Sequence, residues 1–189
     1  LGAMMYYVTY HLGNPSYFMW LLGAHIVGKS AGSALCNPLT TGRSKVQVFR
    51  LAAWAAGLLS IAIFFLPASI SLLVVMVVLV STFYQITTTL MWVMMSDVVD
   101  YGEYTQGKRM DGTIFSTLLS ILKMGMAVSG AIVGWTLGLS GYIPHAEMQN
   151  PVAMSAIIAL FSLVPGVLSI LSALTLRWYT LSDATMADV

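Results

Sequence analysis

The segment SDVVDYGEYTQGKRMDG, residues 96–112, is the densest cluster of charge in an otherwise apolar chain. It holds four of the seven carboxylates of the protein together with two basic residues, namely Asp97, Asp100, Glu103, Asp111, Lys108 and Arg109. An apolar run over residues 113–139 follows, and this run contains a single cation, Lys123. The pattern predicts a polar loop that leads into a membrane-spanning helix.

The composition of the whole chain is that of an integral membrane protein. Of its 189 residues, 58% are hydrophobic and 8% are charged, and the mean hydropathy is +0.85. A soluble domain has about a quarter of its residues charged. The net charge of +1 gives no reason to expect nucleic acid as a partner, and the single Cys36 excludes an internal disulfide.

Apolar runs divide the chain into six candidate spans. The first, residues 1–12, covers only about 18 Å of a hydrocarbon core that is about 30 Å thick, so we expect a helix truncated at its start. The other five are residues 17–39, 46–66, 70–95, 113–139 and 151–176. Residues 40–46 and 96–112 are predicted loops, residues 177–189 form a polar tail, and Pro165 with Gly166 should kink the last helix.

Basic residues gather in alternate connections between these spans. They are Arg43, Lys45 and Arg50 after the second span, Lys108 and Arg109 after the fourth, and Arg177 in the tail. The opposite connections, residues 13–16, 67–69 and 140–150, hold no Lys or Arg. The positive-inside rule therefore predicts that the two basic loops and the C-terminus are cytoplasmic.

One stripe of the predicted helix over residues 113–139 is small and polar. On a period of 3.6 residues it contains Ser116, Ser120, Lys123, Ala127, Gly130 and Gly134. An unpaired ammonium group near the middle of a membrane costs on the order of several kcal/mol. Lys123 should therefore face a carboxylate, a carbonyl cluster or water, either on a solute pathway or in a structural ion pair.

Two other predicted helices offer polar groups at membrane depth. Lys29, in residues 17–39, is either a site residue or a side chain that snorkels to a partner elsewhere. Thr88 and Trp92 lie near the end of residues 70–95. A hydroxyl group can hydrogen-bond a sugar and an indole can stack on its apolar face, although helix-helix contacts are the alternative explanation.

The motifs of common enzyme classes are missing from the sequence. His11, His25 and His145 are isolated, and there is no HExxH, no pair of cysteines and no phosphate-binding glycine loop. We therefore expect no enzyme activity, no metal site and no cofactor. A transporter, in contrast, needs a wet cavity lined by small and polar residues with a few intramembrane charges.

The motifs resemble those of one transporter family. The run DVVDYGEYTQGKRMDG, then Phe115 and Ser116, then Lys123 and GLSGY at residues 138–142, resembles loop 10-11 and helix 11 of the glycoside-pentoside-hexuronide:cation symporters. These are the melibiose carrier relatives of the major facilitator superfamily. YYVTYHLGNP at the start and GRSKV after the second span are similar to helix 7 and loop 8-9 of that family, so the resemblance covers the whole chain. Trp92, GLSGYIP and LVPG resemble the glucuronide and xyloside carriers more than the melibiose carrier itself.

The resemblance implies an all-α integral membrane protein, a six-helix bundle equivalent to the C-terminal half (helices 7-12) of a major facilitator transporter. It implies sodium- or proton-coupled symport of a glycoside, pentoside or hexuronide by alternating access. It places Lys123, Trp92, Tyr7, Tyr6, Thr88 and Ser120 on the substrate or cation pathway. It places Asp97, Asp100, Tyr101, Glu103, Lys108 and Arg109 in a cytoplasmic gate.

The chain departs from the family because the N-terminal six-helix half is missing. The acidic residues that bind the coupling cation in the family lie on that half. We therefore expect an N-terminal six-helix half to be the partner of this chain, in cis or in trans, in the cell inner membrane. Lys29 has no place in the family pattern. The alternative is a non-transporting membrane remnant or assembly subunit from a truncated or split transporter gene.

Overall fold

A computed structural model describes residues 2–107, 110–146, 148–179 and 181 of the chain. Every regular element within these residues is a helix. The elements are α1 (Gly2–Tyr6), the π-helical turn η1 (Tyr7–His11), α2 (Tyr17–Thr40), α3 (Lys45–Ile63), α4 (Ile70–Gln106), α5 (Asp111–Leu139), α6 (Pro151–Phe161), α7 (Leu163–Thr175) and the 3-10 turn η2 (Leu176–Trp178).

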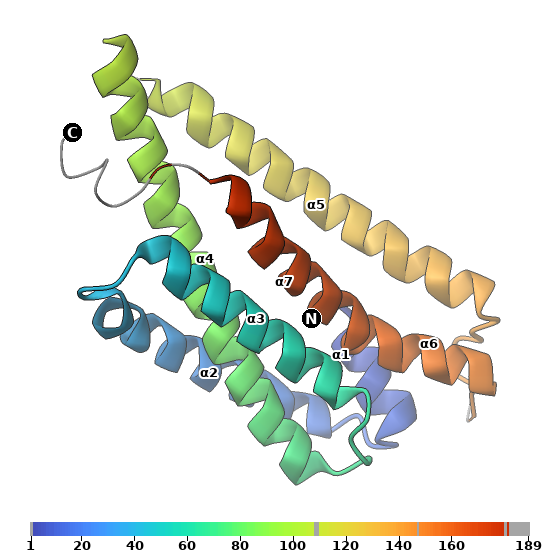
Figure 1. Cartoon of the computed structure of the whole chain (residues 1–189). Helices are drawn as coiled ribbons and strands as arrows, with labels where there is room; N and C mark the ends of the chain where they lie inside the picture. The colour runs from blue at the N-terminus through green and yellow to red at the C-terminus, as the bar shows by residue number, and fades with distance from the viewer. Residues whose placement is uncertain (1, 108–109, 147, 180, 182–189) are drawn as a thin grey trace.

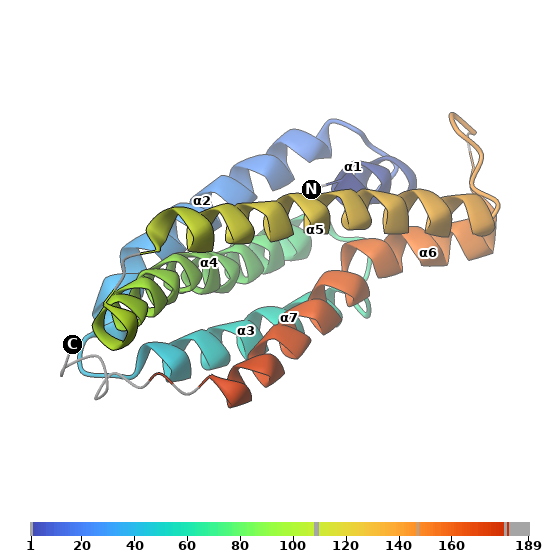
Figure 2. The same cartoon turned by 90° about the horizontal axis from the view of Figure 1, so that it is seen from above.

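The helices form a bundle whose connections gather at two ends (Figure 1). The α2–α3 connection, the end of α4 and the end of α7 lie at one end, which carries Arg43, Lys45 and Arg177 and is called the basic end below. The η1–α2, α3–α4 and α5–α6 connections lie at the opposite end (Figures 1 and 2). Arg43, Lys45 and Arg177 therefore lie at one end, and the connections without Lys or Arg lie at the other.

Helix α4 is the central helix of the bundle, and α5 is a peripheral helix. α4 contacts both α2 and α3, and α3 packs in turn on α7. α5 runs along the edge of the bundle in Figure 1 and meets α6 and α1. Only 6% of the most apolar stretch of α5 is buried, which leaves most of this helix uncovered.

Two glycines set the close approach of α2 to α4. A Cβ atom added at Gly28 would lie 2.7 Å from the Cβ of Ser81, and one added at Gly32 would lie 2.8 Å from the Cβ of Gln85. Each would also press on a backbone carbonyl oxygen of α4. Small residues at this spacing let helix backbones come into direct contact in lipid, so the pair defines how α2 is seated.

A similar contact joins α3 to α7. A Cβ atom added at Gly57 would lie 2.9 Å from the carbonyl oxygen of Gly166, and the reverse distance is also 2.9 Å. Beside this contact the Ser60 hydroxyl donates to the carbonyl of Ser162 at 2.8 Å, and the Ser169 hydroxyl donates to the carbonyl of Ala53 at 2.9 Å. Close backbones and interhelical hydroxyl bonds together hold the outer helix pair.

The polar segment is mostly helix, which corrects the predicted loop over residues 96–112. α4 continues to Gln106 and stops at Gly107, whose φ of +66° closes the helix in the left-handed conformation. Val99 within the segment is 2% exposed, so one side of this extension packs inside the protein. The loop was predicted from the density of charge alone. A helix forms instead because one side of the segment is apolar and buried, and the helix ends at a glycine.

The last predicted span is broken, as expected, but one turn earlier than the Pro165 and Gly166 pair. α6 ends at Phe161 and α7 begins at Leu163. A proline ring clashes with the carbonyl four residues before it and offers no N–H to that carbonyl, so Pro165 disturbs the helix at Phe161. The helix therefore breaks at the residue whose carbonyl loses its hydrogen bond to the proline position.

Four helical segments of the described chain are long and apolar enough to cross a membrane. They are Lys45–Ile63, Ile70–Thr105, Asp111–Leu139 and Pro151–Trp178. Crossing by residues 1–12 and 17–39 stays a prediction, as does a truncated first helix.

Candidate functional site

The small and polar stripe of α5 is left uncovered by the described part of this chain. Its members, Ser116, Ser120, Lys123, Ala127, Gly130 and Gly134, are all exposed. A Cβ atom added at Gly130 or Gly134 would meet no atom within 4 Å. Small residues that pack on nothing in their own bundle are suited to a second set of helices.

Lys123 lies twelve residues into α5, about 18 Å from its start. Among the described residues no carboxylate forms an ion pair with its ammonium group. The structural ion pair that the sequence left open is therefore not made within the described part of this chain. The ammonium needs water or a partner from outside it, because a charge in lipid costs about 2.5–3.5 kcal/mol even on the lowest scales.

Trp92 stands beside the start of α5. Its ring stacks on Phe115 with centroids 6.4 Å apart and planes 14° apart, and its side chain is 37% exposed. One indole face is thus engaged while part of the side chain stays accessible. The Thr88 and Ser120 hydroxyls donate to the carbonyls of Tyr84 and Ser116, one turn earlier in their own helices.

The two predicted tyrosines do not join this group. Tyr7 is 1% exposed and packs on Phe161 with centroids 4.5 Å apart, so it belongs to the core and cannot face a sugar here. Tyr6 meets Tyr142 edge to face at 5.5 Å, and Tyr10 shares a 2.9 Å hydroxyl-hydroxyl hydrogen bond with Tyr142. These tyrosines tie the first helix to the α5–α6 connection at the end opposite to Trp92.

An ion pair at the basic end joins the predicted gate residue Asp97 to Lys45, which the sequence analysis did not include in the gate. The Nζ atom of Lys45, at the start of α3, lies 2.6 Å from a carboxylate oxygen of Asp97 on α4. The two side chains are 29% and 17% exposed, so water partly screens the pair. The GRSKV motif was the available signal, but nothing in a linear sequence pairs residues 52 positions apart.

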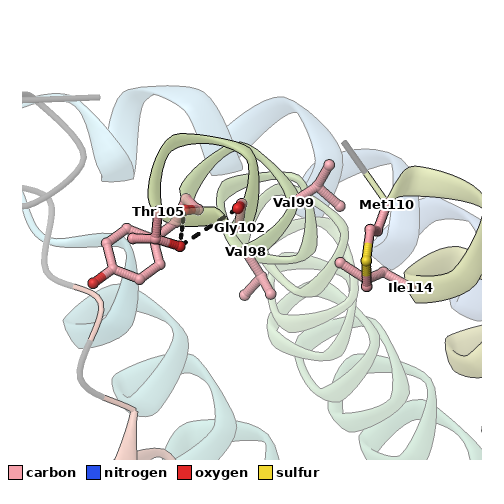
Figure 3. Close-up of a pocket in the computed structure, with 7 residues that line it drawn as sticks. Val98, Val99, Gly102, Thr105, Met110 and Ile114 are labelled. Atoms are coloured by element: carbon pink, nitrogen blue, oxygen red, sulfur yellow. Dashed lines mark hydrogen bonds between the residues drawn. The ribbon is translucent and has the colours of Figure 1, made fainter. Parts of the chain in front are cut away.

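The other predicted gate residues surround the end of α4. Asp100 and Glu103 each have interaction partners, so neither is a lone charge. Tyr101 lines a small pocket of about 240 Å³ between the end of α4 and the start of α5 (Figure 3). Lys108 and Arg109 lie outside the described residues.

A larger open cavity of about 720 Å³, called the basic-end cavity below, lies between the end of α2, the α2–α3 turn and α4. Its lining residues are Ser33, Cys36, Asn37, Thr40, Gly42, Arg43, Ser44, Lys45, Thr89, Leu90 and Val93. Lys29 lies one helical turn before Ser33 and is exposed. No group of three His, Cys, Asp or Glu side chains suited to a metal occurs in the described residues.

Comparison with known proteins finds relatives along the entire chain. An uncharacterized 29.9 kDa protein of Pseudescherichia vulneris is 61% identical over 189 residues, which are all of this chain and 70% of that protein. The inner membrane symporter YicJ of Escherichia coli K12 is 42% identical, and a glucuronide carrier protein homolog of the same organism is 31% identical. This chain is matched in full by both but spans only 41% of the length of each.

The sequence model of a transporter family also matches almost the whole chain, over residues 1–183. The helical architecture and the named symporters among the relatives agree with this match. The chain belongs to the MFS/sugar transport protein family, as the resemblance of its motifs predicted.

Proposed function

We propose that this chain acts as the C-terminal half of a cation-coupled sugar symporter and completes its pathway with an N-terminal six-helix half. The uncovered stripe of α5 around Lys123 carries the proposal. This stripe combines an intramembrane cation with small residues that pack on nothing in the described chain. The relatives named as symporters are more than twice as long as the matched region, which supports a missing half.

The proposed solute is a glycoside or a hexuronide. Relatives named as a putative glycoside/cation symporter, a glucuronide carrier homolog and a putative sulfoquinovose importer support this class. In the proposal Lys123, Ser120, Trp92 and Thr88 border the pathway, and the coupling cation is sodium or a proton. Tyr7 is not part of this pathway because its ring is buried. Tyr6 is not part of it either, because it lies beside Tyr142 at the end opposite to Trp92.

The proposed gate lies at the basic end, which the positive-inside rule makes cytoplasmic in the inner membrane together with the C-terminus. The Lys45–Asp97 ion pair joins the start of α3 to α4 in the described state. Asp100, Tyr101 and Glu103 extend the polar surface of α4 beside it. Exchange of such partners between two access states would let a gate open without leaving buried charges unpaired.

A second candidate is a non-transporting assembly subunit. One observation favours it. The Pseudescherichia vulneris relative is 61% identical, and this chain covers 70% of it against 41% of the symporters, so that relative is itself shorter than they are. A protein shorter than the named symporters thus occurs among the relatives of this chain.

Uptake in membrane vesicles separates the two candidates. The vesicles hold this chain alone, the N-terminal half of YicJ alone, or both, and uptake of a radiolabelled methyl glucuronide is driven by an imposed sodium or proton gradient. A symporter half predicts gradient-driven uptake only when both halves are present. Assembly of the two halves without uptake of this sugar or of a neutral methyl xyloside would support the subunit instead.

A further inference from the structure

We propose that the α3–α7 pair binds the phosphate headgroup of an anionic phospholipid at the basic end, between Arg50 of α3 and Arg177 of η2. Neither arginine lines the basic-end cavity, and neither belongs to the proposed pathway or gate. The proposal concerns contact with the membrane and does not depend on transport.

The packing of α3 on α7 brings the two arginines to one place. The helices are antiparallel, because contacts between them step along both chains, from residues 60 and 162, through 57 and 166, to 53 and 169. The next step places Arg50 level with Ala173, which is fully buried. Arg177 follows Ala173 by four residues, about 6 Å further toward the basic end. Two long side chains at this spacing can reach the same ligand.

Arg50 is directed toward the membrane surface and lacks a partner there. Side chains of an α-helix tilt toward its N-terminus, and α3 begins at the basic end (Figure 1). The Nε atom of Arg50 is buried and has no hydrogen-bond partner among the described residues. A buried donor of this kind is costly unless an acceptor reaches it. An acceptor from outside the described chain would satisfy it.

Two cations at one place also require a counter-charge. Within the described residues no carboxylate forms an ion pair with Arg50 or Arg177. The C-terminus of α7 lies beside them and favours cations, but a helix end carries only about half a negative charge, which two guanidinium groups exceed. Asp183 and Asp188 of the tail lie outside the described residues, and the experiment below tests them as alternative partners.

The surroundings of the two arginines are suited to lipid. Figure 2 shows α3 and α7 together on the side of the bundle away from α2. The exposed side chains of this pair are largely apolar and include Leu51, Leu58, Val167, Leu168 and Leu171. Trp178, next to Arg177, is also exposed, and tryptophan is enriched where the membrane meets water. An anion that reaches this surface therefore arrives beside acyl chains, as a phospholipid headgroup does.

The chemistry of the site fits a phosphodiester. An arginine fork donates two parallel hydrogen bonds to the oxygens of a phosphate, and two forks can hold one phosphate from both sides. The positive-inside rule places the basic end at the cytoplasmic surface, where anionic lipids attract basic residues and basic pockets between helices bind their headgroups. Phosphatidylglycerol has the required single charge, whereas phosphatidylcholine has the same phosphate beside a cation.

Native mass spectrometry of the whole chain in a neutral detergent tests the site. Dioleoyl phosphatidylglycerol and dioleoyl phosphatidylcholine are titrated separately, and the ratio of their affinities is the readout. We expect Arg50→Gln and Arg177→Gln each to lower this ratio about ten-fold, the effect of losing one charge-assisted contact. Arg43→Gln removes an exposed cation of the same end that lines the basic-end cavity, and this matched control should leave the ratio nearly unchanged.

Circular dichroism of each variant checks the fold, and Arg177→Gln, in the exposed turn η2, is the variant least able to disturb packing. Diffuse attraction to basic residues would lower the ratio by a similar factor, about five-fold, in all three variants, and this would overturn the proposal. Displacement of the lipid by excess inorganic phosphate would overturn it in favour of a soluble anion. Selective binding that arises only when Asp183→Asn and Asp188→Asn are combined would overturn it in favour of the tail.

Discussion

The glycine contact between α2 and α4 gives the sharpest prediction of the fold. In Gly32→Ala the new Cβ would lie 2.8 Å from the Cβ of Gln85, whereas carbon atoms in contact lie about 3.5–4.0 Å apart. The helices must therefore separate by about 0.7–1.2 Å or move a backbone carbonyl, and overpacking of this kind costs about 1–3 kcal/mol. The backbones of α2 and α4 cannot stay in direct contact in this variant.

The matched control is Gly23→Ala on the same helix, where an added Cβ meets no atom within 4 Å. Both variants gain the same helix propensity, about 1 kcal/mol, so their difference isolates the contact. For a chain of this size we expect the Tm of Gly32→Ala to lie about 2–12 °C below that of Gly23→Ala.

The chain supplies its own probe for this assay. Cys36 is 6% exposed and lies one turn after Gly32 on the buried side of α2, so a thiol-reactive dye reports the release of this helix on heating. Equal midpoints for Gly32→Ala and Gly23→Ala would refute the reasoning, because α2 and α4 would then not be in backbone contact.

Three further predictions concern single contacts. Lys45→Ala and Asp97→Ala should each weaken the basic end by about 0.5–1 kcal/mol, and a double-mutant cycle on urea unfolding in detergent should show coupling between them; additive effects would argue against the ion pair. Asn150→Ala removes the oxygen that accepts from the Ala153 N–H at 2.7 Å, and circular dichroism on heating should show a loss of about 0.5–2 kcal/mol, whereas no loss would mean that the cap is unused. Burial, and then the hydrogen bond with Tyr10, raise the pKa of Tyr142 above its ordinary value of 10.0. The neutral phenol is therefore favoured in the folded state, and its contribution to stability is complete below pH 10 and is lost as the pH rises further. In a titration followed by tyrosinate absorbance, Tyr142→Phe should have one fewer tyrosine that stays protonated at high pH than the wild type. Identical titration curves would contradict the contact between Tyr142 and Tyr10.

Periodicity predicted the helices well because apolar runs in this chain begin and end at clear signals. α2, α5 and α6 start within two residues of the expected positions, next to Pro15, Gly112 and Asn150. The predicted end of α4 lies eleven residues before the observed end, because the last turns of this helix are charged on one side only. Composition averages the two sides of a helix, whereas burial of Val99 distinguishes them.

The candidate site was harder to predict because it depends on which helices meet. Tyr6 and Tyr7 are neighbours in sequence, yet one is half-buried against Tyr142 and the other fills the core. The Lys45–Asp97 pair needs the seating of α3 on α4, which no local pattern contains. Lys123 was found because a charge in an apolar helix is visible without any knowledge of its neighbours.

The central claim is that the Lys123 stripe of α5 borders a water-filled path once an N-terminal half is present. Single cysteines at Ser120 and Ala127 on the stripe, and at Ile121 and Val128 on the remaining surface, would be placed in a Cys36→Ser chain assembled with the N-terminal half of YicJ. A charged, membrane-impermeant maleimide should label the two stripe positions and not the other two. Stripe positions sealed from water on both sides of the membrane, with uptake intact in Lys123→Gln, would contradict the account.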